Sequence, residues 1–538
     1  MRSIIAPPTG RRGSPIAALL LVVALVLTAC GSPDADEEDA APEGAAEGAP
    51  EAEEPAEDPD EMPEAEPVEG GTLVFGQIFS IENTNPHPQS GNTFNFREAI
   101  FDTLVKLDDE RLPEPWLAES WDLSDDGLTL TMTLRDDVAF HSGAPFDADA
   151  AAWNIEYAAD PDSGVQAGGQ IRDVEVEVLS EFEIALSFEG PKPQIYSALV
   201  GIPMIDPESD IDIAVGGTGP FVLDDFTPGN EMRLVRNEDY WIDGAPILDE
   251  LVIRVIPDES SLVLGLETGE LDVIIQPPMN EAQRIQDAGF ELVNLPGPGN
   301  FNYLVSTVDE PLDDKLVRQA LSFAIDREHF SEVVTFGLSD PTCIVFPPSS
   351  PVWTEELDSC EFDLDRAGEL LDEAGVGDGF EVTIHVATTA VQEVGQFTEA
   401  YQSDLAEIGI AAEIERVEPN VWLDLIVNSE FPGLLGHAYQ FGDLDPALLF
   451  GAHPFGVEQN ASRFESEEYR TLVREAATEL DNDRRIELYR EVTELIKDEA
   501  FILPIGTRVQ LYALNERVNG FQVNALNMPD FRQASLSD

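Results

Sequence analysis

Residues 314–327 have the sequence Asp-Lys-Leu-Val-Arg-Gln-Ala-Leu-Ser-Phe-Ala-Ile-Asp-Arg. Apolar side chains recur here every three or four positions, which is the spacing of one face of an amphipathic helix. They are Leu316, Val317, Ala320, Leu321, Ala324 and Ile325. Asp313 or Asp314 precedes the first of them and can cap the helix by accepting a hydrogen bond from an unpaired backbone N–H. The stretch therefore predicts a capped helix that buries one face.

Helix and strand patterns alternate beyond this stretch. A second helix is expected at 367–374, and alternating apolar residues predict a strand at 382–386. A third helix at 397–408 and a strand at 411–417 follow. Such alternation builds a sheet with helices on its faces. We therefore expect one α/β lobe here, with no internal repeat.

The first half of the chain begins its folded part with a predicted strand at 72–77, a polar loop at 81–93 and a helix at 94–104. Loops between a strand and a helix are where α/β proteins usually place ligand contacts. Further on, residues 128–134 alternate as a strand, and residues 174–188 alternate on both sides of a turn, which predicts a hairpin.

Composition limits the partners of this chain. Its 107 Asp and Glu residues outnumber 28 Lys and Arg, giving a formal net charge of -79. Nucleic acids and anionic surfaces are poor partners for such a field. The excess is spread along the whole chain, which favours adaptation to high salt and says nothing about a ligand. About 470 residues remain beyond the acidic leader, enough for two or three domains.

The N-terminus predicts export and anchoring. Three Arg residues precede an apolar run at 16–27, which is short for a membrane-spanning helix of ~20 residues and suits a signal sequence at 1–29. The run ends in Leu27-Thr28-Ala29-Cys30, which resembles the bacterial lipobox, whose cysteine is lipidated and becomes the first mature residue. The alternative is an ordinary secretory signal with an incidental cysteine. We expect a protein held by Cys30 on the outer side of the cell membrane.

Residues 30–69 are predicted to form a disordered tether. Positions 31–69 contain seventeen Asp or Glu and no Lys or Arg, and they carry too little apolar surface to form a core. Repulsion between like charges keeps such a linker extended. A docking arm for a basic partner is the alternative interpretation.

Two further cysteines, Cys343 and Cys360, flank a proline-rich loop. In an oxidising compartment a disulfide between them is expected. The loop-closure model predicts that it would stabilise the folded protein by about 3 kcal/mol. A zinc site is disfavoured because no Cys or His stands at ligand spacing beside them.

Several motifs, taken in order, resemble the solute-binding protein family 5, the dipeptide-, oligopeptide- and nickel-binding receptors of ABC importers. The matching segments are Glu-Pro-Trp-Leu-Ala-Glu-Ser-Trp at 114–121, Asp-Asp-Gly-Leu-Thr at 125–129, Leu-Arg-Asp-Asp-Val-Ala-Phe-His-Ser-Gly-Ala-Pro-Phe-Asp-Ala-Asp at 134–149, Gly-Thr-Gly-Pro-Phe at 217–221, Arg-Asn-Glu-Asp-Tyr-Trp at 236–241, and 314–327. Matches extend from about Gly71 to the C-terminus.

The resemblance implies a two-lobed α/β fold of the periplasmic-binding-protein type, with a hinge and an inserted domain. Lobe I would comprise 70–108, 215–304 and 508–538, the inserted domain 109–214, and lobe II 305–507. Hinge closure would trap a solute between the lobes for an ABC permease and its ATPase. The resemblance implies a monomeric receptor that does no covalent chemistry and needs no cofactor.

Most motif residues are expected to be structural. Gly127 stands in an Asp-Gly hairpin turn. Arg135 and His141 lie where a strand ends in a polar turn, and four aromatic residues are assigned to packing. These aromatic residues are Trp121, Trp153, Tyr240 and Trp241.

Two stretches supply candidate ligand contacts. The loop at 79–94 offers Asn85, Asn92, Thr93 and Phe94. The second stretch, 436–446, ends a predicted strand in a loop with carboxylates. In peptide-binding relatives an Asp of this loop receives the ligand's amino terminus, which suits a buried ammonium in need of a charge partner.

Asp443 is the candidate for that role, although its spacing to Pro446 departs from the family form. Asp445 is the alternative, or a turn cap. Trp422, Tyr439 and Phe441 are expected to form apolar walls. A nickel alternative rests on His87, His437 and His453, which lack local ligand spacing, so no metal ligand is predicted.

A receptor for di- or oligopeptides is therefore the predicted function. Nickel chelates and oligosaccharides are alternatives on the same fold, and a sensor or chaperone-like binder is another. The rival from a different class is an extracytoplasmic hydrolase. The chain has no Gly-x-Ser-x-Gly, His-Glu-x-x-His or phosphate-loop motif, which disfavours that rival.

Overall fold

The computed structural model describes residues 68–537, apart from 88–93, 109–110, 164, 166–167, 211–215, 389–390, 440–445 and 452–453. The predicted signal sequence, Cys30 and the tether up to residue 67 lie outside the described residues. Within the described part, none of the helices combines the length and the apolar character needed to cross a membrane.

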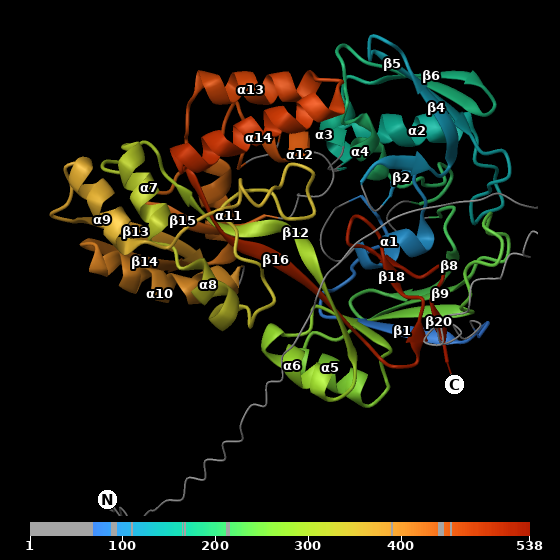
Figure 1. Ribbon diagram of the computed structural model, residues 1–538. Coiled ribbons are helices and arrows are strands. Elements are labelled where there is room, and N and C mark those ends of the chain that lie inside the picture. The colour runs from blue at the N-terminus through green and yellow to red at the C-terminus, as the bar shows by residue number, and fades with distance from the viewer. Residues whose placement is uncertain are drawn as a thin grey trace, which may run out of the picture. The chain divides into compact units, whose positions relative to one another are not determined.

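One sheet of ten strands runs through the described residues (Figure 1). In spatial order its strands are β14 (Ile410–Val417), β13 (Phe380–Ala387), β15 (Leu434–Ala438), β12 (Glu291–Val305), β16 (Ile502–Leu514), β11 (Val273–Ile275), β1 (Thr72–Gln77), β10 (Glu250–Val255), β9 (Glu231–Arg236) and β8 (Phe221–Thr227). The strands predicted at 72–77, 382–386 and 411–417 are confirmed as β1, β13 and β14.

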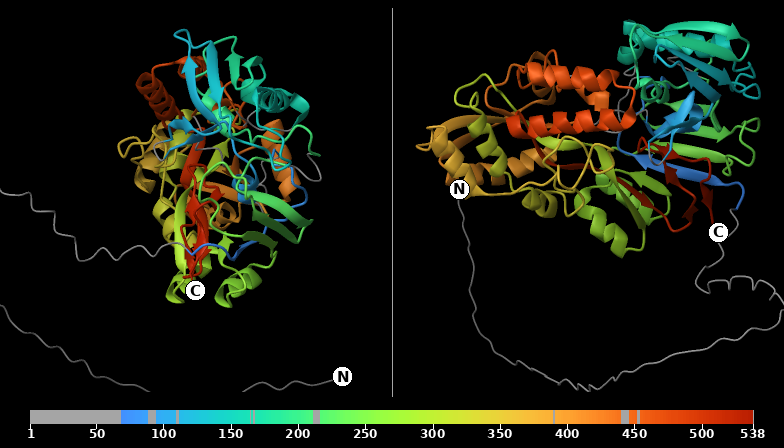
Figure 2. Two further views of the ribbon diagram at one scale, coloured as in Figure 1. Left: turned by 90° about the vertical axis from the view of Figure 1, so that its right-hand side faces the viewer. Right: turned by 45° about the horizontal axis from the view of Figure 1, so that its top comes forward.

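Two groups of parallel strands lie on either side of the long pair β12 and β16. On one side β1 is parallel to β10 and β11. On the other side β13 is parallel to β14 and β15. Strands β12 and β16 are antiparallel to each other and join the two groups. Helices pack against this sheet, as the further views in Figure 2 show, so the predicted α/β class is confirmed.

Helices cover both faces of the sheet around β13 and β15. They are α7 (Lys315–Phe323), α9 (Leu364–Glu373), α10 (Gln392–Glu407), α11 (Pro419–Asn428), α13 (Glu467–Thr478) and α14 (Asn482–Glu499). One core joins α7, α9 and α10, with Leu321 and Phe397 buried in it. A second core joins α11, α13 and α14, with Tyr469 and Val492 buried in it.

The stretch at 314–327 forms the capped helix that its spacing predicts. Asp314 accepts a hydrogen bond from the backbone N–H of Leu316 at 2.8 Å and caps α7. Arg318 donates to the carbonyl of Glu499 at the end of α14 (2.8 Å) and to its carboxylate (3.0 Å). Arg327 donates to the carbonyl of Pro504 in β16 at 2.9 Å. The two arginines therefore join α7 and the residues that follow it to α14 and β16.

A smaller antiparallel sheet has the strand order β4 (Ala118–Leu123), β5 (Thr129–Leu134), β7 (Glu183–Ser187) and β6 (Glu175–Ser180). The helix α2 (Ala148–Ala159) shares its core. The predicted hairpin is confirmed as β6 and β7, and Gly127 turns from β4 to β5 with a φ of +68°. The predicted limits of the inserted domain and of both lobes stay predictions.

The first helix is shorter than its pattern predicts. Helix α1 spans Phe94–Ile100, whereas the sequence predicts a helix to residue 104. The carbonyl of Ile100 accepts a hydrogen bond from the N–H of Gly219 at 2.9 Å. A Cβ atom at Gly217 would lie 2.1 Å from that carbonyl oxygen, so the glycines of the 217–221 motif permit this close approach. A tertiary contact therefore occupies a helix end that local spacing cannot reveal.

Asp102, which follows α1, has a fully buried side chain that accepts hydrogen bonds from several motifs. The donors are Trp116 Nε1 (2.8 Å), Arg532 Nη2 (3.0 Å), Thr218 Oγ1 (3.1 Å), Tyr240 OH (3.2 Å) and Trp241 Nε1 (3.2 Å). Burial alone would raise the pKa of Asp102, but Arg532, Lys106 and the two indole groups outweigh it and lower that pKa. We call these six residues, Asp102 and its five donors, the Asp102 cluster.

The remaining motif residues have structural partners, as expected. Arg135 forms a two-bond ion pair with Asp137 (2.7 and 2.9 Å) and lies over the ring of Trp241. His141 Nε2 lies 3.0 Å from the carbonyl oxygen of Gly219. Trp153 stacks on Tyr157 of the same helix. The packing and structural roles predicted for these residues are confirmed.

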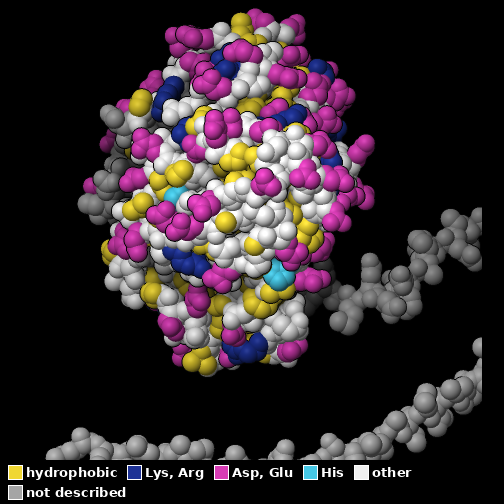
Figure 3. All heavy atoms as spheres, turned by 90° about the vertical axis from the view of Figure 1, so that its left-hand side faces the viewer, with side chains coloured by type: hydrophobic (Ala, Val, Ile, Leu, Met, Phe, Trp, Pro, Cys, Tyr) yellow, Lys and Arg dark blue, Asp and Glu magenta, His cyan; other side chains and the backbone are white. Residues whose placement is uncertain are grey.

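Acidic side chains are scattered over the face shown in Figure 3, with Lys and Arg side chains interspersed among them. No single acidic patch dominates this view, in agreement with the even spread of charge along the sequence.

We expect Asp102→Asn to lower the free energy of unfolding by about 3–5 kcal/mol, because Arg532 would lose the fully buried one of its two close charge partners, Asp102 and Asp530. Guanidinium denaturation at neutral pH measures this. Asp136→Asn, an exposed change in a neighbouring motif, should alter stability by less than about 0.5 kcal/mol. The extra stability of the wild type over Asp102→Asn should be fully present above pH 3.8, the pKa of Asp in the unfolded chain. It should disappear as the pH falls through the lower pKa of Asp102 in the folded protein. Equal stability of the two variants would contradict a central role for Asp102.

Candidate functional site

The pairing of β12 with β16 is interrupted at one place. Its register shifts between Pro296 and Asn300 and again between Phe301 and Asn302. Residues 296–300 have the sequence Pro-Gly-Pro-Gly-Asn, and residues 296–301 lie opposite residues 506–509 of β16. We call 296–300 and 506–509 together the junction. A Cβ atom at Gly297 would lie 2.7 Å from the carbonyl oxygen of Arg508, so the two strands need a glycine to pass this closely.

The parallel strands on both sides have their carboxyl ends directed toward the junction. Ile275 at the end of β11 pairs with Tyr512, while Val273 pairs with Leu514, so β11 runs toward the junction residues of β16. Ala438 at the end of β15 pairs with Phe301 next to the junction. Ligands of open α/β sheets bind beyond the carboxyl ends of the strands. The topology therefore brings two potential ligand-binding edges to one place.

On the β1 side, a buried amide network holds the strand end against α1. Gln77 ends β1, accepts a hydrogen bond from Asn95 at 2.7 Å and donates to the carbonyl of Phe79 at 2.6 Å. Phe79 is 39% exposed, which is high for a phenylalanine this close to a strand end. Polar and aromatic groups thus stand together beyond the carboxyl end of β1.

The candidate ligand residues of the 79–94 loop have different surroundings. Asn85 is buried, and its side-chain oxygen accepts a hydrogen bond from the N–H of His87 at 3.0 Å, which closes a local turn. Phe94 is half-buried at the first position of α1. Asn92 and Thr93 lie outside the described residues. Ligand contact by all four stays a prediction.

On the β15 side, three rings lie in series. Trp422 of α11 stacks on His437, with their ring centres 5.9 Å apart, and His437 stacks on Tyr439, with ring centres 6.4 Å apart. Trp422 is half-buried and donates to the carbonyl of Gly436 at 2.8 Å. Tyr439 is buried in the second core, and its hydroxyl donates to the carbonyl of Val345. The structure thus gives Tyr439 a packing contact, while its role as a ligand wall stays a prediction.

The carboxylate candidates, Asp443 and Asp445, lie outside the described residues, as do Phe441 and His453. Of the histidines considered for nickel, His87 packs against the ring of Tyr157, and His437 Nδ1 lies 3.2 Å from Asn302 Oδ1. Neither is part of a group of metal-ligand residues within the described part of the chain. The nickel alternative therefore gains no support from their surroundings.

Arg508 of β16 received no role from the sequence. It is half-buried, and its guanidinium carbon lies 5.9 Å from the ring centre of Phe301. Burial lowers the pKa of Arg508, and the charge of Glu393 near the start of α10 acts in the opposite direction. The sequence feature that could have singled it out is that Arg508 is the sole charged residue among the thirteen of β16.

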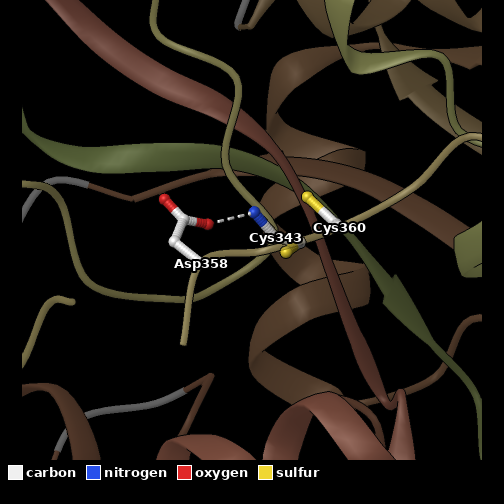
Figure 4. Close-up of side chains that lie close together, drawn as sticks. All are labelled: Cys343, Asp358 and Cys360. Carbon is white, nitrogen blue, oxygen red and sulfur yellow. Dashed lines mark hydrogen bonds between the residues drawn. The ribbon is translucent and has the colours of Figure 1, made fainter. Parts of the chain in front are cut away.

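A cavity of about 910 Å³ lies apart from the junction, among α7, α14 and the 343–361 segment. Cys343 and Cys360 line it. Together with Asp358 they form a group in which one potential ligand atom of each residue lies within 4.8 Å of the others (Figure 4). The carboxylate of Asp358 already accepts hydrogen bonds from Thr342, Trp353 and the N–H of Cys343, at 2.8–2.9 Å. It therefore orders the loop, and a fourth ligand for zinc is not among these residues.

Both thiols are free in this structure, with Cys343 buried and Cys360 exposed. The disulfide expected from the sequence is not formed here and stays a prediction. The hydrogen bond from Cys343 lowers the pKa of the Cys360 thiol to about 7, because a donated hydrogen bond favours the thiolate.

The profile of the bacterial extracellular solute-binding proteins, family 5, matches residues 113–453. The glutathione-binding protein GsiB of Salmonella paratyphi A is 28% identical over 462 residues, covering 80% of this chain and 87% of that protein. The di/tripeptide-binding protein 1 of Pseudomonas aeruginosa is also 28% identical over 462 residues, covering 78% and 86%.

A solved structure of the periplasmic binding protein DppA from Helicobacter pylori, in complex with the peptide STSA, superposes with a TM-score of 0.74. It is 25% identical in sequence and covers 88% of this chain and 99% of its own. The similarity therefore extends well beyond the residues that the family profile matches.

We expect alkylation of Cys360 by iodoacetamide in the reduced protein to accelerate with rising pH around a midpoint of about 7, because the thiolate is the reactive form. Cys343→Ala should move the midpoint up toward the ordinary thiol value, since it removes the hydrogen bond to Cys360. Peptide mass spectrometry over a pH series measures both. A midpoint that is the same in the two proteins would contradict the proposed interaction.

Proposed function

Because the chain belongs to the bacterial extracellular solute-binding proteins of family 5, we propose that it captures small peptides outside the cytoplasm and delivers them to an ABC permease. The observation that carries the proposal is the convergence of two groups of parallel strands on the junction. A solute held there can contact both groups, as a receptor that closes on its ligand requires.

The junction suits a hinge between two lobes. Only β12 and β16 link the two strand groups within the ten-stranded sheet, and their ladder is interrupted at 296–300. Changes in backbone angle at a few such residues allow two packed bodies to close around a ligand. The closed form then gains the ligand contacts from both sides, and the permease would recognise that form.

Peptides are the proposed solutes because one similar protein is named for di- and tripeptides and another has been solved in complex with a peptide. Asp443 is the proposed partner of the ligand's amino group, with Asp445 as the alternative, and Trp422 and Phe441 are proposed walls. Nickel chelates and oligosaccharides remain alternatives on the same fold. The name of GsiB adds glutathione to the range of solutes bound by similar proteins.

The family consists of binding proteins, which argues against the extracytoplasmic hydrolase considered from the sequence. A sensor or chaperone-like binder would share the fold but would lack a permease partner. Intact recovery of bound solute separates a receptor from a hydrolase, and reconstitution with a permease separates it from a sensor.

We expect the mature protein to retain intact peptides from a pool of synthetic di-, tri- and tetrapeptides, at close to one peptide per protein. After gel filtration, mass spectrometry of the denatured complex identifies the retained species. Parallel pools of malto-oligosaccharides and nickel–histidine chelates test the alternatives. Retention of either of these in place of peptides would contradict the peptide assignment, and time-dependent shortening of the peptides would indicate the hydrolase.

We also propose that lipid on Cys30 anchors the receptor, with residues 31–69 as its tether. An anchored receptor meets its permease again at a high effective concentration, which favours repeated delivery. The acidic tether would stay extended and hold the folded part away from the bilayer.

We expect cells fed radiolabelled palmitate to label the wild-type protein and Cys360→Ala equally, and to leave Cys30→Ala unlabelled. The Cys360 variant controls for removal of a cysteine as such. Equal labelling of the Cys30 variant, or the absence of label on the wild type, would favour an ordinary secretory signal.

A further inference from the structure

At the junction, Arg508 is a cation without a hydrogen-bond or ion-pair partner among the described residues. Among the described Lys and Arg side chains, Arg508 and the exposed Arg172 make no hydrogen bond or ion pair with another residue. The charge of Glu393 raises the pKa of Arg508, but Glu393 forms no ion pair with it. The ring contact of Arg508 with Phe301, at 5.9 Å, is at the outer limit of a cation–π interaction.

The absence of a partner is unusual for a half-buried cation in this chain, which has 107 acidic and 28 basic residues. Two other buried arginines, Arg318 and Arg327, have several partners each. Arg327 donates to four carbonyl groups, and Arg318 binds both the carbonyl and the carboxylate of Glu499. The half-buried guanidinium of Arg508 has no such contacts with described residues, so its N–H groups are available to a partner from outside the chain.

The position of Arg508 supports this interpretation. It belongs to the junction segment of β16, opposite the interruption of β12, and the carboxyl ends of β11 and β15 are directed toward it. Asn300, on the opposite strand, has a second unsatisfied atom, because its side-chain oxygen is buried without a hydrogen bond. The junction thus combines an unpartnered donor group with an unpartnered acceptor.

We propose that Arg508 binds a carboxylate of the captured solute, so that the receptor selects ligands that carry a free carboxyl group. A guanidinium presents two parallel N–H groups that match the two oxygens of a carboxylate, and an interaction formed in a partly dry site is stronger than one in water. The ligand contributes the charge partner that the described residues do not supply. This inference rests on the proposed receptor function and specifies the class of its ligand.

Two substitutions separate charge from packing. Arg508→Met keeps an unbranched apolar side chain over Phe301 and removes the charge. Arg508→Lys keeps the charge and removes the planar pair of donors. Arg172→Met is the matched control, since Arg172 also lacks a protein partner but is exposed on a different part of the chain.

The probes are one tripeptide pool with free carboxyl termini and the same pool with amidated termini. Competition measured by mass spectrometry gives the relative affinities. We expect the wild type and Arg172→Met to prefer the free pool by about tenfold or more, because a buried carboxylate–arginine pair would be lost with the amide. Arg508→Met should lose this preference and weaken binding of the free pool by a similar factor, while Arg508→Lys should retain a part of it.

Thermal unfolding without ligand checks the folding of each variant. We expect Arg508→Met to unfold at the wild-type temperature or higher, since it removes an unpaired charge. Equal capture of both pools by the wild type, or a full preference retained by Arg508→Met, would overturn the role of Arg508 and leave the receptor function standing. Capture of neither pool by the wild type would overturn the proposed peptide function and this inference with it.

Discussion

The side chain of Asp102 is fully buried, and its carboxylate accepts hydrogen bonds from five donors that belong to four parts of the chain. A buried charge is costly unless it is paired and hydrogen-bonded, so these parts are stable only together. Trp116, Thr218, Trp241 and Arg532 come from segments separated by up to 416 residues, between positions 116 and 532. The Asp102 cluster thus fixes the end of α1, the glycine motif at 217–221 and the C-terminal segment relative to one another.

Arg532 and Arg508 illustrate two different uses of a cation in this very acidic protein. Arg532 is fully enclosed and bonds Asp102, Asp530 and Tyr240, so its charge is neutralised within the fold. Arg508 is half-buried, its burial lowers its pKa, and no described residue forms an ion pair or hydrogen bond with it. The first arrangement stabilises the folded chain, and the second leaves binding capacity for a ligand. The contrast arises from local partners and not from the overall charge.

The junction is the place where the two groups of parallel strands meet. Parallel strands place their loops at one edge, and here two such edges are directed at the same short segment of β12 and β16. The glycine at 297 permits the close strand approach, and the interrupted ladder provides few hydrogen bonds to resist bending. The cavity beside Cys343 and Cys360 lies apart from the junction.

Much of the fold could be predicted from local spacing. The cap at Asp314, the apolar face of α7, strands β1, β13 and β14, and the hairpin of β6 and β7 all follow from periods of 3.6 or 2 and from turn residues. Periodicity failed at the end of α1, because Gly219 bonds the carbonyl of Ile100 from a distant segment. It could not assign Asn85 to a local turn or Tyr439 to a core position.

The sequence by itself determined the α/β class, the family and the order of the elements, because each depends on residues that are near neighbours in the chain. The tertiary structure alone decided which polar side chains are satisfied. Asp102 and Arg508 are both single charged residues in ordinary surroundings in the sequence. Folding gives Asp102 five donors and brings no described partner to Arg508, since hydrogen bonding depends on groups that distant segments bring within about 3 Å.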